Sequence, residues 1–412
     1  MTYGLIGEKL GHSFSKQVHK YLFDYEYELK ELRPDELKSF FNKKYFRAIN
    51  VTIPYKQDVI PFLDVISDEA KNIGVVNTIV NRDGKLYGYN TDYLGLKLLI
   101  EKTGIEIKGK KVLILGSGGT SKTAIVVAKD LECREVYRLS RKQTDGCITY
   151  KEALKSHTDA EVIINTTPSG MYPSIYESAI DINAFPKLSG VVDAVYNPLR
   201  SKLVCDAKKR GITAIGGLFM LIAQAVFSAE KFTDTKIDIN KIDEIYNDIL
   251  LSKQNIVLIG MPGSGKSTVG KALAEELNLN FVDTDSEIVK LSGSEITDIF
   301  AKVGEDGFRD LESKVIKEVS ALQGTVIATG GGAVLRQENI ELFKENGKIY
   351  FLDRPLSQIE ATFDRPLSSN KDMLQQRYNE RYEIYCKSCD KHIISNTTVS
   401  DAVKSIKGDL LK

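Results

Sequence analysis

The chain has 412 residues, 56 basic and 56 acidic side chains, and therefore a formal net charge of zero. This length predicts two or three domains, and a hydrophobic share of 42% excludes a mainly disordered chain. The balanced charge argues against a nucleic-acid-binding protein, which needs a basic surface. No apolar run approaches the roughly 18 residues of a membrane-spanning helix, and the charges of Glu8 and Lys9 argue against a signal peptide.

The five cysteines are an odd number and lie far apart, which argues against a disulfide framework and predicts a reducing compartment, the cytoplasm. Cys386 and Cys389 have C-x-x-C spacing near His392, so a zinc site or redox chemistry is an alternative. Because a structural zinc ion usually needs four ligands and no second Cys/His pair is in view, we expect buried small side chains instead.

Short β-like runs alternate with helical patterns along the chain, which predicts α/β domains with mostly parallel sheets. We expect strands at residues 2–6, 48–53, 110–115, 135–139 and 255–259, and helices from about residue 16 and at 58–73, 93–103, 122–131, 237–251 and 268–277. No Pro-rich or Gly/Ser-rich linker separates the helix at 237–251 from the strand that follows it. This helix is therefore expected to end one unit and to lead almost directly into another.

A glycine-rich loop follows the apolar strand at 110–115 and precedes the helix expected at 122–131. It reads G-x-G-x-x-S, and the small Ser121 can replace the third glycine, which only permits close helix–strand packing. The next strand ends in a serine and two cations rather than in an acid, which suits the 2′-phosphate of NADP. A doubly wound domain whose glycines merely form turns is the alternative. The predicted cofactor-binding residues are Gly116, Gly118, Gly119, Ser140, Arg141 and Lys142.

Polar clusters also follow the strands predicted in the N-terminal part, where α/β sheets collect ligands. They read G-H-S-F-S, N-V-T-I-P-Y-K, V-N-T and N-T-D. Lys56 and Asp92 can pair, which would place a proton donor near a carbonyl that receives a hydride. Taken singly, each residue is more often structural, because a lysine is usually a solvated surface charge and Asn-Thr is common turn chemistry.

Together these segments resemble the shikimate dehydrogenase family over residues 1 to about 250, with further matches at 192–199 and 216–225. The resemblance implies that NADPH reduces 3-dehydroshikimate to shikimate and that Lys56 and Asp92 are catalytic. It implies substrate-binding roles for Ser13, Ser15, Thr52, Asn77, Tyr196 and Gln224, and cofactor-binding roles for Gly217 and Met220. Ser140 stands where the family commonly has Asn, and the stretch after Lys142 is shorter.

A second glycine loop, at 260–268, fits G-x-x-x-x-G-K-[ST] in full between the strand at 255–259 and the helix at 268–277. Such a loop holds phosphate oxygens with backbone N–H groups at a helix N-terminus. Its lysine reaches the β- and γ-phosphates and its serine binds Mg²⁺, so the motif predicts ATP or GTP and leaves the acceptor open. The predicted nucleotide-binding residues are Gly263, Ser264, Gly265, Lys266, Ser267 and Thr268, with Lys266 also catalytic.

Other residues of the C-terminal part suggest what the acceptor is. Asp283 and Asp285 end a strand, where the first could hold Mg²⁺ through water and the second could polarise a hydroxyl. Arg309 has an acid three residues later, Glu312, to hold it, and the glycines at 330–332 expose backbone N–H groups. Taken singly, the aspartates could be helix caps and the arginines surface charges.

As a set, residues 254–412 resemble the shikimate kinase family. The resemblance implies ATP as phosphoryl donor, Mg²⁺ held by Ser267 and Asp283, and catalytic roles for Asp285, Lys266 and Arg365, the last on the family's lid. It implies a shikimate site made by Asp285, Arg309, Glu312, Gly330, Gly331, Gly332 and Arg381, with Tyr385 after that arginine. The lid segment is short, and the arginine that often stacks on adenine is absent from 359–361.

We therefore expect a bifunctional cytoplasmic α/β enzyme that acts on small molecules. Its expected parts are a substrate domain (1–91 and 218–252), a Rossmann NADP domain (92–217), and a P-loop domain with a parallel sheet, like that of nucleoside-monophosphate kinases (254–412).

Two alternatives remain. A ligand-sensing regulator related to such enzymes would have lost chemical groups, whereas Lys56, Asp92 and Lys266 are retained. A quinate- or NAD-preferring dehydrogenase could accompany a kinase for another small polyol, and Ser13, Ser15 and Arg141 weigh against that alternative.

Overall fold

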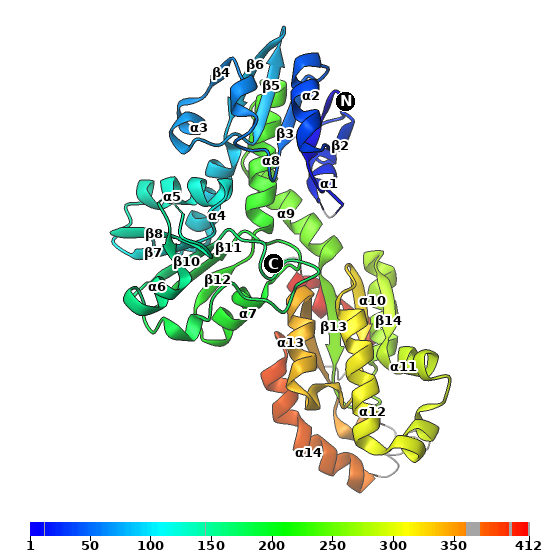
Figure 1. The fold of residues 1–412 in the computed structure, drawn as a ribbon. Helices are drawn as coiled ribbons and strands as arrows, with labels where there is room; N and C mark the ends of the chain where they lie inside the picture. The colour runs from blue at the N-terminus through cyan, green and yellow to red at the C-terminus, as the bar shows by residue number, and fades with distance from the viewer. Residues whose placement is uncertain (12, 145, 360–370, 395–397, 411–412) are drawn as a thin grey trace. The chain divides into compact units, whose positions relative to one another are not determined.

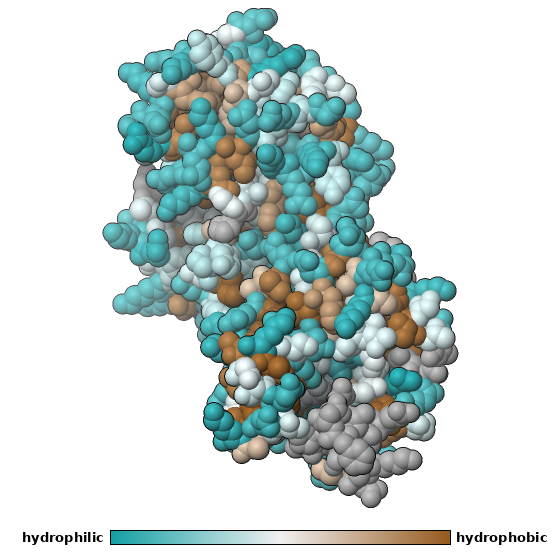
Figure 2. All heavy atoms as spheres, turned by 90° about the vertical axis from the view of Figure 1, so that its right-hand side faces the viewer, coloured by the Kyte–Doolittle hydropathy of each residue, from teal (hydrophilic) through white to brown (hydrophobic). Residues whose placement is uncertain are grey.

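The computed structural model describes residues 1–11, 13–144, 146–359, 371–394 and 398–410. It divides into two compact units, Met1–Tyr246 and Asn247–Lys412, and each is described by itself (Figure 1). Within the described residues, no helix combines the length and the apolar character needed to cross a membrane. On the face shown in Figure 2, hydrophilic residues predominate and hydrophobic ones form separate groups between them.

The first unit contains two sheets. In the first sheet, with the order β2-β1-β3-β5-β6-β4, β1 runs parallel to β2 and β3, whereas β5 runs antiparallel to β3 and β6. Its strands are β1 (Tyr3–Gly7), β2 (Tyr27–Glu31), β3 (Ala48–Val51), β4 (Val65–Ile66), β5 (Thr78–Arg82) and β6 (Lys85–Tyr89), and its helices are α1 (Ser15–Lys20), α2 (Leu37–Lys43) and α3 (Asp68–Ile73). Buried Ile6, Phe41, Ile49 and Ile79 belong to its core.

The single helix expected at 58–73 is wrong. The chain instead makes a short 3₁₀ turn at Ile60–Phe62, then β4 and α3. Pro61 lies inside the expected helix and lacks the N–H that a helix interior needs. Ser67 begins α3 as a separate helix, because its side chain accepts a hydrogen bond from the Ala70 N–H at 3.3 Å.

The first sheet is also less parallel than expected. Asp83 and Gly84 have φ angles of 52° and 83° and connect β5 to β6. Two consecutive residues in the left-handed region form a turn that matches the twist of an antiparallel hairpin. The Asp-Gly pair therefore explains the antiparallel pairing of β5 with β6.

The second sheet is parallel throughout, in the order β12-β11-β10-β7-β8-β9. The direction of winding changes between β7 and β10, so the glycine loop after β7 lies at the switch point where doubly wound sheets bind dinucleotides. Its strands are β7 (Lys111–Leu115), β8 (Glu135–Ser140), β9 (Ile148–Thr149), β10 (Val162–Asn165), β11 (Gly190–Asp193) and β12 (Thr213–Ile215), and its helices are α4 (Thr91–Thr103), α5 (Gly119–Asp130), α6 (Tyr150–Ser156) and α7 (Lys202–Lys209).

Helix α8 (Leu218–Thr233) joins the two parts of the first unit, because it packs on α4 and also contacts β3 and β5. Gly95 permits the close approach of α4 to α8: a Cβ atom there would lie 2.9 Å from the Met220 carbonyl oxygen. Helix α9 (Asn240–Lys253) follows, and it buries Ile242, Ile245 and Ile249 at helical spacing.

The second unit is built on one parallel sheet with the order β14-β15-β13-β16-β17. Hydrophobic clusters cover both faces of this sheet, and the expected α/β class is thus confirmed for both units. The strands are β13 (Asn255–Ile259), β14 (Asn280–Asp283), β15 (Thr325–Ala328), β16 (Gly347–Asp353) and β17 (Lys391–Ile394), and the helices are α10 (Lys266–Leu277), α11 (Thr284–Ser292), α12 (Ile296–Ser320), α13 (Gln337–Asn346), α14 (Lys371–Ser388) and α15 (Val399–Leu410).

Cys386 lies on α14 and Cys389 directly after it. Both side chains are partly buried against the core of the second unit, as expected of small apolar residues. The described part of the chain holds no group of three or more His, Cys, Asp or Glu side chains placed to bind a metal ion.

Candidate active sites

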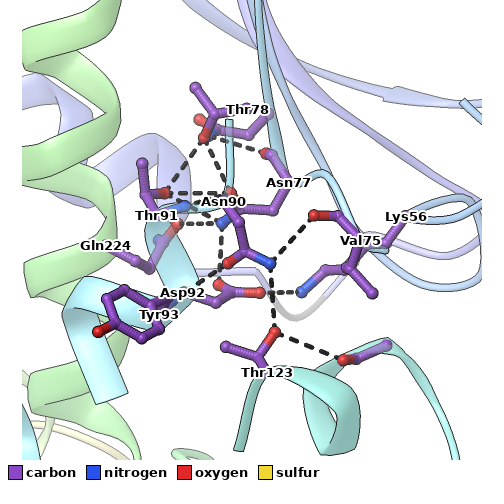
Figure 3. Close-up of polar contacts among 12 residues, drawn as sticks. Lys56, Val75, Asn77, Thr78, Asn90, Thr91, Asp92, Tyr93, Thr123 and Gln224 are labelled. Carbon is purple, nitrogen blue, oxygen red and sulfur yellow. Dashed lines mark hydrogen bonds and ion pairs between the residues drawn. The ribbon is translucent and has the colours of Figure 1, made fainter. Parts of the chain in front are cut away.

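Lys56 and Asp92 form the ion pair predicted from the sequence. Lys56 follows β3, Asp92 lies in the first turn of α4, and Nζ is 2.6 Å from Oδ2 (Figure 3). Their side chains are only 13% and 7% exposed, so the charges interact in a weakly screened environment. A buried ammonium with one fixed partner is a group that can donate a proton at a defined position.

Asn77 fixes the orientation of that aspartate. Its Nδ2 donates to Oδ1 of Asp92 at 2.9 Å and to Oγ1 of Thr91 at 3.0 Å, and its Oδ1 accepts from the Thr91 N–H at 2.7 Å. Gln224 on α8 lies 3.4 Å from the same Nδ2. Each oxygen of Asp92 therefore has its own donor, and two of the other predicted residues, Lys56 and Asn77, meet at its carboxylate.

Asn90 is a residue of this network that we did not single out from the sequence. Its Oδ1 caps α4 by accepting from the Tyr93 N–H at 3.1 Å, and its Nδ2 donates to the Val75 carbonyl and to Oγ1 of Thr123 on α5 (Figure 3). It thereby links the start of α4 to α5 and to the segment before β5. The N-T-D motif contained the signal, because Asn before a helix is a common cap.

Ser13 and Ser15 lie together: their hydroxyl oxygens are 3.1 Å apart, and the Ser15 N–H also donates to Oγ of Ser13. Among the described residues, neither serine hydrogen-bonds to the Lys56–Asp92 pair. Phe14 between them packs against Tyr196, with ring centroids 5.2 Å apart. The structure thus brings the predicted Tyr196 next to the serine pair.

Asp193 holds the loop that carries Tyr196. It is fully buried and accepts from the Val195 N–H at 2.9 Å, from Asn165 at 2.9 Å and from Ser201 at 2.5 Å. Burial raises its pKa to about 6, and the three hydrogen bonds act in the opposite direction. Burial also raises the pKa of Tyr196, so its phenol is neutral at physiological pH.

A cavity of about 1720 Å³ lies at the switch point of the second sheet. Its walls include Lys56, the glycine loop, the end of β8 and the two threonines after β10, so Lys56 and the loop face the same space. The predicted residues that line it are Lys56, Gly116, Gly118, Gly119, Ser140, Arg141 and Lys142. A cavity of this size with glycines at one part and cations at another fits a dinucleotide phosphate.

The first glycine of the loop is required by close packing as well as by conformation. Gly116 has a φ of 115°, and a Cβ atom there would lie 2.7 Å from Oγ1 of Thr166. Ser121, in place of the third glycine, is fully buried and donates to the Gly118 carbonyl at 2.7 Å, so the small side chain fits as predicted. Thr166 and Thr167 also line the cavity and were not expected.

Two predicted cofactor-binding residues, Gly217 and Met220, are not among the residues that line the cavity. Both are buried at the start of α8, and a Cβ atom on Gly217 would lie 2.2 Å from the Ala194 carbonyl oxygen. Thr52 is half-buried, and its methyl group lies against Gly7: a Cβ atom on Gly7 would lie 2.6 Å from Cγ2 of Thr52.

The second glycine loop has the backbone of a phosphate cradle. Gly260, Gly263 and Gly265 have φ angles of 147°, 81° and 91°. Nζ of Lys266 lies 2.9 Å from the Gly260 carbonyl oxygen, which folds the lysine over the loop. Oγ of Ser264 is buried without a hydrogen-bond partner. An orphaned polar atom in a loop of this shape fits the phosphates of a nucleotide.

Two oxygen donors meet beside this loop. Oγ of Ser267 donates to Oδ2 of Asp283 at 2.6 Å, while Oδ1 of Asp283 caps α11 by accepting from the N–H groups of Asp285 and Ser286. The cap and the candidate metal ligand are thus the same side chain. A hydroxyl and a carboxylate fit the oxygen preference of Mg²⁺. Thr268, in the first turn of α10, is exposed.

The predicted acceptor residues converge on the glycines after β15. A Cβ atom on Gly330 would lie 2.6 Å from Oδ1 of Asp285 and 2.8 Å from Oε1 of Glu312, and one on Gly332 would lie 2.2 Å from Nη2 of Arg309. No side chain larger than hydrogen fits at either position without displacing these groups. The glycines are therefore required by close approach, in addition to any role of their N–H groups.

Gly331 links this cluster to other elements. Its carbonyl accepts from Nη1 of Arg381 at 3.2 Å and from the Tyr385 hydroxyl at 2.5 Å, both on α14. A Cβ atom on Gly331 would lie 2.6 Å from Cδ of Pro262 in the phosphate cradle. The acceptor cluster therefore adjoins the cradle, as transfer of a phosphoryl group requires.

Arg309 has the partner predicted for it and one that was missed. Nη1 lies 2.6 Å from Oε2 of Glu312, and Nη2 lies 3.2 Å from Oε1 of Glu305. Burial raises the pKa of Glu312, and the Arg309 charge opposes that rise. Nε of Arg309 and Oε1 of Glu312 are buried without partners, which fits a polar ligand. The predicted Arg365 lies outside the described residues.

Comparison with known proteins gives two matches along the chain. A family model for the shikimate dehydrogenase substrate binding domain matches residues 5–79, and one for shikimate kinase matches residues 262–410. The NADP(+) shikimate dehydrogenase of Clostridium perfringens (strain ATCC 13124) is 37% identical over 270 residues, which are 60% of this chain and 97% of that protein. The one of Halothermothrix orenii is 39% identical over 267 residues, 57% of this chain and 91% of that protein.

Solved structures agree with this division. Shikimate dehydrogenase 1 from Peptoclostridium difficile has a TM-score of 0.57 and 36% identity, covering 60% of this chain and 98% of that one. A chorismate mutase/shikimate 5-dehydrogenase fusion protein from Clostridium acetobutylicum has a TM-score of 0.56 and 36% identity, covering 60% and 96%. The chain therefore belongs to the shikimate dehydrogenase family and continues into a shikimate kinase domain, so that an NADP-dependent dehydrogenase and an ATP-using kinase of the shikimate pathway share one polypeptide.

Proposed function

We propose that the first unit reduces 3-dehydroshikimate to shikimate and that the second unit phosphorylates this shikimate at its 3-hydroxyl. The observation that carries the proposal is the presence, on one chain, of the Lys56–Asp92 pair facing a dinucleotide-sized cavity and of an Arg309–Glu312 cluster beside a phosphate cradle. The corresponding domains would be 1–91 with 218–252, 92–217, and 254–412.

In the reduction, Lys56 would donate a proton from Nζ to the oxygen of the substrate carbonyl. NADPH, when bound, supplies the hydride to the carbonyl carbon. Asp92 holds the ammonium at 2.6 Å, and Asn77 holds Asp92, so the proton donor is oriented before substrate binds. The low exposure of both side chains, 13% and 7%, strengthens the attraction that keeps the ammonium in place.

The remaining residues of the first site would position the ligands. Ser13 and Ser15 would bind the substrate carboxylate, which accepts two hydrogen bonds from adjacent hydroxyls. Further substrate contacts would come from Thr52, Asn77, Tyr196 and Gln224. Gly116, Gly118 and Gly119 would approach the pyrophosphate of NADP, and Ser140, Arg141 and Lys142 would hold its 2′-phosphate, with further cofactor contacts from Gly217 and Met220.

In the kinase, backbone N–H groups of residues 263–268 and the ammonium of Lys266 would hold the phosphates of ATP. Ser267 and Asp283 would hold Mg²⁺, whose charge neutralises phosphate oxygens when it is bound. Asp285 would accept the proton of the 3-hydroxyl. We further propose that Arg365 contacts the transferring phosphate.

The shikimate carboxylate would bind in the acceptor cluster. Arg309 and Arg381 supply two guanidinium groups that suit a carboxylate, and Gly331 and Gly332 bring backbone polar groups to the same place. The unpartnered Nε of Arg309 is available for this ligand. Glu312 holds Arg309 in position.

We propose the cytoplasm as the location. The five cysteines, which are free, are compatible with a reducing compartment.

A coupled assay tests both halves. The full chain is incubated with 3-dehydroshikimate, NADPH, ATP and Mg²⁺, while NADPH absorbance is followed and products are identified by mass spectrometry. We expect NADPH to be consumed and shikimate 3-phosphate to accumulate, and we expect the reaction without ATP to end at shikimate. If NADPH is not consumed, or if added shikimate is not phosphorylated, the corresponding half of the proposal is wrong.

A further inference from the structure

Arg354 is a half-buried cation at the carboxyl end of β16, next to the phosphate cradle. β16 pairs with β13, so that Phe351 lies opposite Ile259, the residue before the cradle begins. A Cβ atom on Gly260 would lie 2.6 Å from the Leu352 carbonyl oxygen. The chain just before Arg354 therefore packs directly on the first residue of the cradle.

The side chain of Arg354 reaches the other end of the cradle. A Cβ atom on Gly265, the residue before α10, would lie 4.0 Å from Nη1 of Arg354. A side chain at this position would thus touch the guanidinium, which places Arg354 beside the loop proposed to hold the phosphates. The sequence motifs did not indicate this contact, because Arg354 belongs to none of the kinase segments singled out from the sequence.

The charge of Arg354 is not neutralised within the described residues, where it forms no ion pair. The adjacent acid, Asp353, is occupied elsewhere: its Oδ2 lies 2.9 Å from Nε2 of His392, and its Oδ1 accepts from the Tyr378 hydroxyl at 3.4 Å. A half-buried guanidinium loses hydration, and a bound anion can replace the lost interactions. Its planar donors suit two phosphate oxygens at once.

We infer that Arg354 is a further nucleotide-binding residue of the kinase, which donates hydrogen bonds from its guanidinium to the phosphates held by the cradle. The inference rests on the proposed nucleotide site and adds a cation that neither the loop motif nor the family resemblance indicated. Lys266 and Arg354 then act on the phosphates from two different elements, α10 and the end of β16. In-cis arginines of this kind stabilise phosphate charge in other phosphoryl-transfer enzymes.

The test measures binding by calorimetry on the full chain with three probes: ADP, inorganic tripolyphosphate and adenosine. We expect Arg354→Gln to weaken ADP and tripolyphosphate alike, by about tenfold or more, as the loss of a charge-assisted hydrogen bond predicts. Arg354→Lys should recover part of the loss. Arg336→Gln is the matched control, because Arg336 is in the same unit and pairs with Asp310 at 2.7 Å on the surface.

The outcomes separate the inference from the proposed site. If the wild type binds ADP and tripolyphosphate, Lys266→Ala weakens both, and Arg354→Gln binds them like the wild type, the Arg354 inference is wrong while the site stands. If Arg354→Gln weakens ADP but not tripolyphosphate, the guanidinium contacts the base and the phosphate assignment is wrong. If the wild type binds neither ADP nor tripolyphosphate, both proposals are wrong. Unchanged circular dichroism and thermal unfolding confirm that the variants are folded.

Discussion

The two active sites differ in how fully their buried polar atoms are paired without a ligand. In the dehydrogenase, Asp92 has a separate donor on each carboxylate oxygen, namely Nζ of Lys56 and Nδ2 of Asn77. In the kinase, Oγ of Ser264, Nε of Arg309 and Oε1 of Glu312 are buried without partners among the described residues. The first site is complete before substrate arrives, whereas the second has atoms that a ligand must satisfy.

The difference follows from how each site is assembled. The proposed catalytic pair of the dehydrogenase, Lys56 and Asp92, joins two segments, the turn after β3 and the first turn of α4, which a hydrogen-bonded network holds. The kinase site gathers groups from the cradle, α11, α12, the glycines after β15 and α14. Unpaired buried groups cost free energy until a ligand pairs them. We therefore expect substitutions in the first site to change mainly kcat and those in the second to change mainly KM.

The largest effect is expected from Lys56→Ala. Removing the proposed proton donor should lower kcat for reduction by about 10²–10⁴-fold, with a smaller change in the KM for 3-dehydroshikimate. Phosphorylation of added shikimate should be unchanged, and Lys155→Ala, at an exposed position in the same unit, should leave both rates unchanged. Steady-state kinetics of both reactions on each variant provide the measurement. Loss of both activities in folded protein would contradict independent sites.

Glu312→Gln tests the kinase side of the comparison. The substitution keeps the shape of the side chain but removes the charge 2.6 Å from Nη1 of Arg309, so the guanidinium loses its fixed orientation. We expect the KM for shikimate to rise by about 10–100-fold, the value of a charged hydrogen bond, with a smaller change in kcat. Glu318→Gln, exposed on the same helix, is the control. A fall in kcat at unchanged KM would contradict the expectation that substitutions in the kinase site change mainly KM.

Motifs in loops after strands were the part of both sites that the sequence could predict. Parallel strands end at one edge of a sheet, so residues in such loops come together without knowledge of side-chain packing. The pairing of Lys56 with Asp92 and of Arg309 with Glu312 was predictable for this reason and from helical spacing. The Ser121 substitution was also interpretable, because only a small side chain was required.

Contacts that depend on packing could not be predicted. Arg354 approaches Gly265 through the register of β16, which no local pattern specifies. Glu305 differs, because it lies four residues before Arg309 and this helical spacing could have indicated the pair. The helix expected at 58–73 was wrong because Pro61, which lacks an N–H, prevents a continuous helix there. The antiparallel hairpin of β5 and β6 depends on Asp83 and Gly84, which both have positive φ, and the expectation of mostly parallel sheets did not include it.

Arg141→Gln tests whether the first unit, like the kinase site, has a polar side chain that is paired only when a ligand binds. Arg141 lines the cavity proposed to bind NADP and forms no ion pair among the described residues. In this it is similar to the kinase groups that have no partner without a ligand. We expect the KM for NADPH to rise about tenfold, from loss of a contact to the 2′-phosphate, and the KM for NADH to be unchanged. Arg134→Gln, whose side chain pairs with Glu161 on the surface, is the control. An equal rise for NADH would show that Arg141 does not bind this phosphate.

The smallest effect concerns His19, a buried group of the first unit outside its active site that, like the kinase site, has an unpaired polar atom. Its ring stacks on Tyr27 with centroids 3.9 Å apart, and Nδ1 lies 2.6 Å from the Tyr25 hydroxyl, yet Nε2 is buried without a partner. Burial lowers its pKa from 6.5 to about 3, and the nearby Asn50 side chain opposes this shift only in part. The folded unit therefore keeps this histidine neutral throughout the pH range in which the unfolded chain protonates it.

The sign of the pH effect follows from that difference. Near pH 6.5 the unfolded chain binds a proton at His19, whereas the folded unit binds none until the pH approaches 3. The stability due to neutral His19 is therefore fully present above pH 6.5 and declines as the pH falls toward 3. Between pH 6.5 and 5.5 we expect the free energy of unfolding to fall by about 1 kcal/mol more in the wild type than in His19→Phe. Urea unfolding followed through residual dehydrogenase activity measures this difference at each pH. Parallel pH profiles for the two proteins would mean that His19 takes up its proton as readily in the folded unit as in the unfolded chain, and the predicted effect of burial on its pKa would then be wrong.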